Sequence, residues 1–121
     1  MGININKRKL GAEYEELAVN YLLNRGYVIL ERNYRCKFGE IDIIARQKTG
    51  NDIFLIFIEV KYRKNLRKGN PFEAVNIQKQ RIIKKVAEYY LLTKGYSFSE
   101  NIRFDVVGIT GNKIELIQNA F

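Results

Sequence analysis

The sequence predicts one α/β domain, residues 1–121, in which a mixed β-sheet is flanked by helices. Apolar residues recur at helical spacing over residues 8–24 and again after Asn70, which predicts two amphipathic helices. Ile53–Ile58 is a run of six consecutive apolar residues, as in a central strand covered on both faces. Gly111-Asn112 has the composition of a two-residue hairpin turn between two further strands. The predicted order is therefore α-β-β-β-α-β-β.

The first half of the chain is expected to hold one helix and three strands. The helix runs from about Arg8 to Asn24, and Gly26 ends it because glycine readily adopts the left-handed conformation of a C-cap. Residues 1–9 are expected to form a flexible basic segment. Glycine-containing turns separate the strands that follow. These strands span Tyr27 to about Arg35, Glu40 to about Arg46, and Ile53 to Tyr62.

The second half is expected to hold a loop, a helix and a hairpin. Residues 63–69 form the loop. Asn70, Pro71 and Glu73 suit the N-cap, first and third positions of a helix, which then runs to about Thr93. The last two strands span about 102–110 and 113–118.

The composition excludes several kinds of site. There is no histidine, so a Ser-His-Asp or Cys-His catalyst, a histidine-ligated zinc site and an imidazole general base are excluded. Cys36 is the single cysteine, which excludes an internal disulfide or a multi-cysteine metal site and suits a reducing cytoplasm. The longest apolar run is far shorter than a membrane span, and residues 1–9 lack the apolar region of a signal peptide. We therefore expect a cytoplasmic protein with no membrane partner.

The net charge of +8 favours an anionic partner, of which nucleic acid is the commonest. Small domains often carry a net charge of magnitude about 2–8 for solubility alone, so that alternative stays open. Basic residues cluster in the loop after the third strand and on the second helix, where they are expected to hold a phosphate backbone. They are Arg63, Lys64, Arg67, Lys68, Lys79 and Arg81.

Polar residues also occur where the strand pattern requires apolar ones. Alternation places Glu40, Asp42 and Ile44 on one face of the second strand. It places Glu59 and Lys61 on the face that the earlier apolar residues of the third strand use for burial. A hairpin between these two strands would bring Asp42 close to Glu59.

Two carboxylates at about 4 Å repel each other by roughly 4 kcal/mol at an effective dielectric constant of ~20. A domain with about 5–15 kcal/mol of total stability needs a cation to keep Asp42 and Glu59 together. Oxygen ligands without histidine favour a hard ion, Mg²⁺ or Mn²⁺, and Lys61 could then hold a phosphate oxygen or orient the attacking water. The alternative is that Lys61 itself neutralises Glu59 within a structural ion network.

Each helix contributes one further candidate. Glu15 and Glu13 border opposite edges of the first helix's apolar face, so the helical wheel does not choose between them, and either could be an ordinary boundary carboxylate. Lys79 falls in the middle of the apolar face of the second helix. A lysine in that position either extends to solvent or meets an anion, which could be the carboxylate cluster or a phosphate.

Asp42, followed after sixteen residues by Glu59-Val60-Lys61, resembles the signature of the PD-(D/E)XK nuclease superfamily. The surrounding segments are similar to those of the small bacterial YraN family of endonuclease-like proteins, over roughly residues 10–110. Ile41 stands where the superfamily name expects proline. The matching segments are Gly39-Glu40-Ile41-Asp42, Phe57-Ile58-Glu59-Val60-Lys61, Gly11…Glu15…Leu17-Ala18…Tyr21-Leu22…Gly26-Tyr27, and Lys79-Gln80-Arg81-Ile82.

The resemblance implies a restriction-endonuclease-like fold similar to that of archaeal Holliday-junction resolvases. It also implies catalytic roles for Asp42, Glu59 and Lys61, and it selects Glu15 as the glutamate of the first helix. Asp42, Glu59 and Glu15 would then bind Mg²⁺ or Mn²⁺. Glu40 is expected to play a structural part.

The leading hypothesis is a metal-dependent nuclease-like domain that binds DNA rather than RNA and hydrolyses its phosphodiester bonds, with branched DNA as an expected substrate. One alternative is a nucleic-acid-binding module without catalysis on the same fold. Another is an interaction or structural domain whose charged cluster is an internal ion network. The likeness to resolvases adds a homodimer as an expectation.

Overall fold

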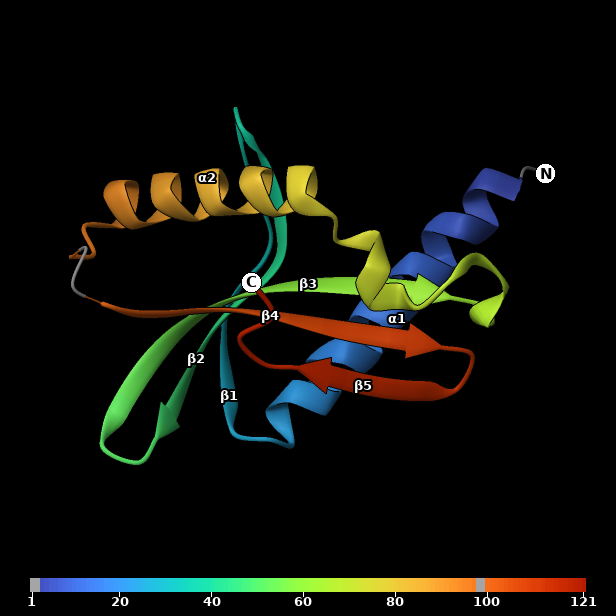
Figure 1. Ribbon diagram of the computed structural model, residues 1–121, viewed down its shortest axis with the longest axis horizontal. Coiled ribbons are helices and arrows are strands. Elements are labelled where there is room, and N and C mark those ends of the chain that lie inside the picture. Colours follow the sequence, from blue (N-terminus) through green and yellow to red (C-terminus); the bar gives the residue numbers. More distant parts are fainter. Residues whose placement is uncertain (1–2, 98–99) are drawn as a thin grey trace.

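The computed structural model describes residues 3–97 and 100–121, with side chains other than those of residues 3–9 and 68. Its elements follow the predicted order, with two short 3₁₀ turns before the second helix (Figure 1). They are α1 (Ile3–Leu23), β1 (Tyr27–Cys36), β2 (Gly39–Thr49), β3 (Asp52–Arg63), η1 (Leu66–Lys68), η2 (Pro71–Ala74), α2 (Ile77–Lys94), β4 (Asn101–Thr110) and β5 (Lys113–Ile117).

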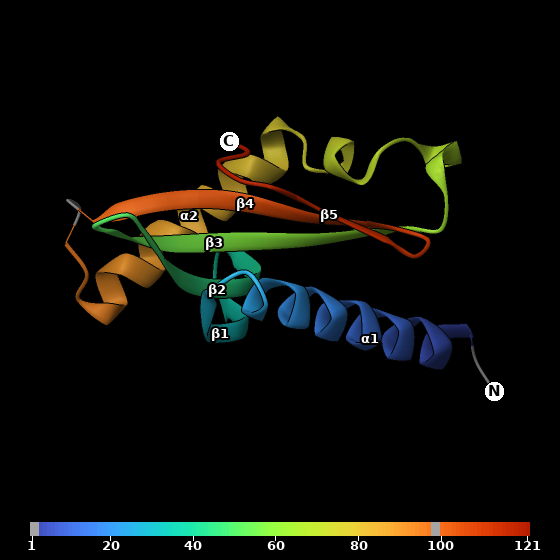
Figure 2. The same cartoon turned by 90° about the horizontal axis from the view of Figure 1, so that it is seen from below.

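The five strands form one mixed sheet in the order β1-β2-β3-β4-β5. Only β3 and β4 pair in parallel; the other neighbours are antiparallel. A parallel pair needs a long crossover, and α2 supplies it between β3 and β4. Helix α1 runs along one side of the sheet (Figure 2). The α/β fold class is thus confirmed.

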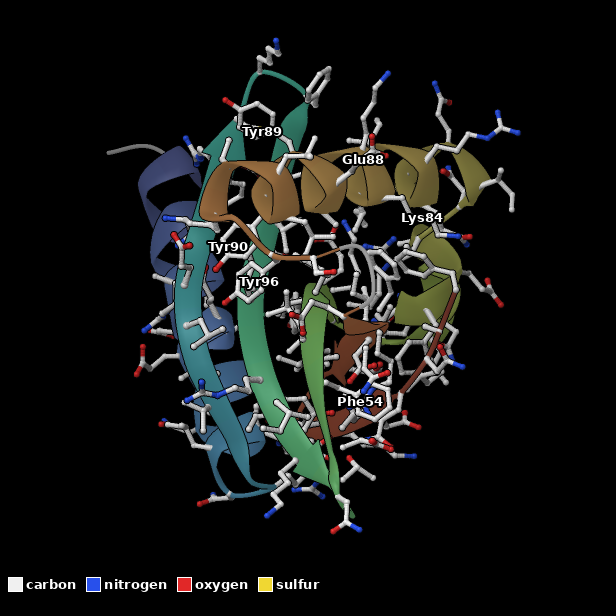
Figure 3. The ribbon with its side chains drawn as sticks, turned by 90° about the vertical axis from the view of Figure 1, so that its left-hand side faces the viewer. Phe54, Lys84, Glu88, Tyr89, Tyr90 and Tyr96 are labelled. Carbon is white, nitrogen blue, oxygen red and sulfur yellow. The ribbon has the colours of Figure 1, made fainter. Side chains whose placement is uncertain are left out.

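Apolar side chains of β3 pack alternately on both faces of the sheet. Leu55 and Phe57 join the cluster under α2, and Ile56 and Ile58 join the cluster under α1. All four are nearly or fully buried, which explains the uninterrupted apolar run. Figure 3 shows part of the α2 side, where Tyr90 and Tyr96 lie between the helix and the strands. Within the described residues, no helix is long and apolar enough to cross a membrane.

Both helices begin at other places than the sequence predicts. Helix α1 begins at Ile3, so residues 3–9 of the segment expected to be flexible are helical, while residues 1 and 2 lie outside the described part. Helix α2 begins at Ile77, not after Asn70, because two asparagines act as caps in turn. The side chain of Asn70 accepts a hydrogen bond from the Phe72 amide at 3.0 Å and starts only the turn η2. Asn76 accepts from the Lys79 amide at 2.9 Å and starts α2.

A buried polar network joins β1 to β4 and was not predicted from the sequence. The Asp105 side chain is fully buried and accepts hydrogen bonds from the Tyr27 hydroxyl at 2.7 Å and from the Asn119 amide at 2.9 Å. Arg103 donates to both oxygens of Asp105 at 2.9 Å and also to Gln47 at 2.9 Å. With these donors, both Asp105 oxygens are paired, so the network holds the sheet together instead of forming an open site.

Candidate functional site

Strand β2 separates from β3 at the position where the polar residues begin. Their antiparallel pairing runs from Thr49 opposite Asp52 to Ile43 opposite Ile58 and then stops. Strand β3 continues beside β4, so its amide groups after Ile58 have no β2 backbone to bond. The side chain of Asp42 takes that place, because its Oδ2 accepts a hydrogen bond from the Val60 amide at 2.8 Å.

This separation also breaks the alternation expected for β2. Ile41 and Ile44 both pack in the cluster under α2, while Ile43 packs in the cluster under α1. Asp42 lies at the break and lines a cavity with residues of α1, so it does not share the environment of Ile44. The expectation that Glu40, Asp42 and Ile44 share one face is therefore wrong, although Asp42 still meets Glu59.

Glu59 is buried and neutralised by two lysines. Its side chain is 4% exposed, and its Oε2 lies 3.2 Å from Lys79 Nζ and 3.6 Å from Lys61 Nζ. Of the two alternatives for Lys79, extension to solvent and contact with an anion, the structure shows the second, and the anion is the carboxylate of Glu59. For Glu59 taken alone, the arrangement matches the ion-network alternative.

Asp42 has no such partner. No lysine or arginine nitrogen of the described side chains lies within 4.0 Å of its carboxylate. Burial, followed by the negative charge of Glu59, raises the pKa of Asp42 to about 7, although the Val60 hydrogen bond and the charge of Lys61 oppose this. Asp42 is thus a partly buried carboxyl beside a second carboxylate, with no ion pair of its own among the described side chains.

A cavity of about 260 Å³ gives access to Asp42. Helix α1 supplies Glu15 to its lining, whereas Glu13 is exposed, so the structure favours Glu15 between the two alternatives of the helical wheel. Glu15 Oε1 accepts a hydrogen bond from Asn33 Nδ2 at 2.9 Å and lies 3.4 Å from Arg32 Nε. The lining residues are Gly11, Tyr14, Glu15, Asp42, Val60 and Tyr62.

These carboxylates suit a hard divalent ion with few protein ligands. Among the described residues, no three acidic, cysteine or histidine side chains converge closely enough to form a metal site by themselves. Mg²⁺ keeps several waters and is commonly bound through one or two carboxylates plus substrate phosphates. Asp42 and Glu59 meet that requirement, and Glu15 lines the same cavity as Asp42. Glu40 is exposed and pairs with Arg35 at 2.9 Å instead.

The predicted nucleic-acid-binding residues are placed differently from one another. Lys64 and Arg67 are exposed in the loop after β3, and Arg81 is exposed on α2. Arg63 donates to the Tyr62 carbonyl at 3.2 Å, and its buried Nε has no hydrogen-bond partner in the described structure. Lys79 is held by Glu59, and the side chain of Lys68 lies outside the described side chains.

Comparison with known proteins agrees with the sequence motifs. The model of the uncharacterised protein family UPF0102 matches residues 14–109, a span that contains Asp42, Glu59 and Lys61. The chain belongs to this family. A UPF0102 protein of Lachnoclostridium phytofermentans is 51% identical over 117 residues, which cover 97% of this chain and 96% of the relative. One from Thermodesulfovibrio yellowstonii is 51% identical over 115 residues, covering 93% and 96%. The predicted relation to YraN-like proteins is confirmed as UPF0102 membership.

In this UPF0102 protein, the Asp42 carboxyl predicts an unusual dependence of stability on pH. Its pKa rises from 3.8 to about 7 on folding, so folding favours the protonated form. The protonated form of Asp42 therefore stabilises the folded protein. This stabilisation is fully present below pH 4 and is lost as the pH rises through 7. It changes the free energy of unfolding by about 4 kcal/mol in metal-free protein.

Urea unfolding of the wild type and of Asp42→Asn, both in EDTA, isolates this contribution. The difference in free energy between them should grow in favour of the variant from pH 4 to pH 7.5. Asp52→Asn, at the exposed first position of β3, should follow the wild type. If the free energies of unfolding of the wild type and Asp42→Asn depend on pH in the same way, the pKa of Asp42 is not raised by folding.

Proposed function

We propose that this protein is a metal-dependent nuclease that hydrolyses phosphodiester bonds of DNA. The observation that carries the proposal is the carboxyl of Asp42, which has no ion pair of its own among the described side chains and whose pKa is raised to about 7. It faces a cavity next to the lysine-paired Glu59. Repulsion between Asp42 and Glu59 lowers the stability of the metal-free protein, and a bound cation would offset that repulsion.

Asp42 and Glu59 would hold Mg²⁺ or Mn²⁺, with Glu15 assisting directly or through water. When bound, such an ion polarises the scissile phosphate and activates the attacking water. Hard oxygen donors suit this chemistry. The hydrogen bond from the Val60 amide fixes the Asp42 carboxylate in place before any substrate arrives.

The two lysines would divide the remaining work. Lys79 is the closer partner of Glu59 at 3.2 Å and would hold that carboxylate in its orientation. Lys61 lies farther away at 3.6 Å and is more loosely tied. It is a proton-bearing cation that can orient the attacking water or stabilise negative charge that develops on the phosphate.

Basic residues of the loop after β3 would hold the DNA backbone across the site. Lys64 and Arg67 are exposed there and have no carboxylate partner among the described residues. Contacts to phosphates carry no sequence information but fix the position of the strand. The resemblance to resolvases favours DNA with branched or otherwise interrupted base pairing as the substrate. The protein would act on it in the cytoplasm.

A cleavage assay with purified protein tests this function. Labelled branched, duplex and single-stranded DNA should be cut in Mg²⁺ or Mn²⁺ but not in EDTA, and branched DNA should be cut fastest. Asp42→Ala and Glu59→Ala, purified in parallel, should show no cleavage above background, while Glu40→Ala should retain it. If no substrate is cut under any metal condition, the enzymatic proposal is wrong.

The pairing of Glu59 with two lysines favours a second candidate, a DNA-binding module without catalysis. Such a module predicts salt-sensitive binding: neutralising about six phosphates gives a log–log salt slope near −5. Its affinity should not change with Asp42→Ala or with chelation of metal. If DNA and RNA do not bind even at low salt, and Glu59→Ala loses stability, the cluster is a structural ion network.

A further inference from the structure

A tyrosine of α1 and a tyrosine of β3 stack on each other at the edge of the candidate site. The rings of Tyr14 on α1 and Tyr62 on β3 have centroids 3.7 Å apart and an interplanar angle of 14°. Both side chains are only partly buried.

These rings belong to two adjoining hollows. One is the cavity that contains Asp42 and Glu15. The other has a volume of about 230 Å³ and is lined by Leu10 together with Gly11, Tyr14 and Tyr62, which the two hollows share. An added Cβ at Gly11 would meet nothing within 4 Å, so the missing side chain leaves open space beside the rings. An apolar, aromatic hollow thus adjoins a carboxylate site.

We propose that this hollow receives an unpaired nucleobase of the DNA strand whose phosphate lies at Asp42 and Glu59. This inference rests on the proposed function and names its substrate class: DNA with at least one unstacked nucleotide next to the cleaved bond. The occupant would carry a flat apolar surface beside a phosphate, since the aromatic hollow shares three residues with the carboxylate-lined cavity where the proposed metal would bind a phosphate. A nucleotide unit has both features.

Stacking chemistry supports this choice over a fully paired duplex. A base on an aromatic side chain gains roughly 1–3 kcal/mol, with little dependence on which base it is. A base inside a duplex is already stacked on both faces, and extruding it costs a few kcal/mol. Bases at junctions, flaps and loops avoid most of that cost. The hollow therefore selects interrupted DNA through its unpaired base, without reading sequence.

A 2-aminopurine binding experiment tests this inference directly. The probe is a DNA duplex with one unpaired 2-aminopurine, and the reference is the same duplex fully paired. Without metal, the wild type should quench the unpaired probe through stacking and bind it more tightly than the reference. Tyr62→Phe should behave as the wild type. Tyr62→Ala and Tyr14→Ala should lose the quenching and weaken binding of the unpaired probe by about 10-fold, with the paired duplex unchanged.

A filling substitution guards against loss of folding in the alanine variants. Gly11→Leu adds a side chain to open space on a helix, so it should fold at least as stably as the wild type. It should nevertheless abolish the preference for the unpaired probe. Tyr89→Ala, which removes a ring packed on Phe38 away from the site, is the matched control and should keep the preference.

The outcomes separate this inference from the proposed function. If DNA is bound and cut but Tyr62→Ala and Gly11→Leu keep the quenching and the preference, the base-binding hollow is wrong and the nuclease proposal stands. If both probes weaken equally in Tyr62→Ala, the stacked pair is only structural, and the inference is also wrong. If the wild type binds neither probe, the base-binding hollow is wrong, and the cleavage assay in Mg²⁺ or Mn²⁺ decides the nuclease proposal separately.

Discussion

Asp42→Asn is expected to abolish cleavage and, at the same time, to make the metal-free protein more stable. The new amide can still accept the hydrogen bond from Val60, which Asp42 Oδ2 accepts at 2.8 Å in the wild type. The amide can also donate a hydrogen bond to Glu59, whereas the Asp42 carboxylate of the wild type repels Glu59. Because the amide carries no charge, it removes the repulsion from Glu59 and also takes away one carboxylate ligand of the proposed metal.

The two effects have opposite signs, and both are large. Cleavage should fall by about 1,000-fold or more, equivalent to about 4 kcal/mol of transition-state stabilisation. The free energy of unfolding at pH 7.5 in EDTA should rise by about 4 kcal/mol. Single-turnover cleavage and urea unfolding on the same preparations measure them.

Asp52→Asn is the matched control, since it makes the same chemical change at an exposed position, and both quantities should stay near wild type. A structural ion network predicts another pattern for Asp42→Asn, with lower stability and no activity to lose. A destabilised Asp42→Asn protein would therefore contradict the metal-site account.

Asp105→Ala is expected to have the largest effect on stability. The side chain is fully buried and bonds both Tyr27 and Arg103, so its removal leaves a guanidinium of low exposure without its anion. Breaking a buried pair from one side costs about 3–5 kcal/mol. That is a large part of the roughly 5–15 kcal/mol that stabilise a domain of this size. Urea unfolding at pH 7.5 measures the loss.

Glu115→Ala gives the comparison, because this carboxylate forms an exposed ion pair with Lys113 at 3.8 Å. Exposed pairs contribute about 0–1 kcal/mol, so the variant should unfold nearly as the wild type does. If Asp105→Ala costs no more than Glu115→Ala, the buried network does not hold the sheet together in the way proposed.

The order of elements was predictable because each depends on local patterns. The apolar run of β3 requires cover on both faces, and Gly95 ends α2 in the left-handed conformation that it readily adopts. The environment of Lys79 was predictable in part, since a lysine among apolar residues either extends to solvent or meets an anion. In these cases the sequence of one segment and the spacing of its apolar residues are sufficient for the prediction.

Other features depend on contacts between segments that are far apart in the sequence. The spacing of apolar residues within one segment does not predict such contacts. Asp42 bonds the Val60 amide because β2 leaves β3 there, and neither strand's pattern marks that point. Tyr27 and Asp105 are 78 residues apart, although Arg103 and Asp105 at alternate strand positions hint at a shared face. The contact between Tyr14 and Tyr62 likewise needs the packing of α1 on the sheet.

Paramagnetic broadening by Mn²⁺ in an amide NMR spectrum tests most directly whether Asp42 and Glu59 form a metal centre. Substoichiometric Mn²⁺ should selectively broaden the amide signals of residues around the two carboxylates, including Val60, and excess Mg²⁺ should restore them. The same titration of Asp42→Asn should lose this selectivity, while Asp52→Asn should keep it. Broadening confined to exposed carboxylates elsewhere, or unchanged in Asp42→Asn, would contradict a metal centre at Asp42 and Glu59.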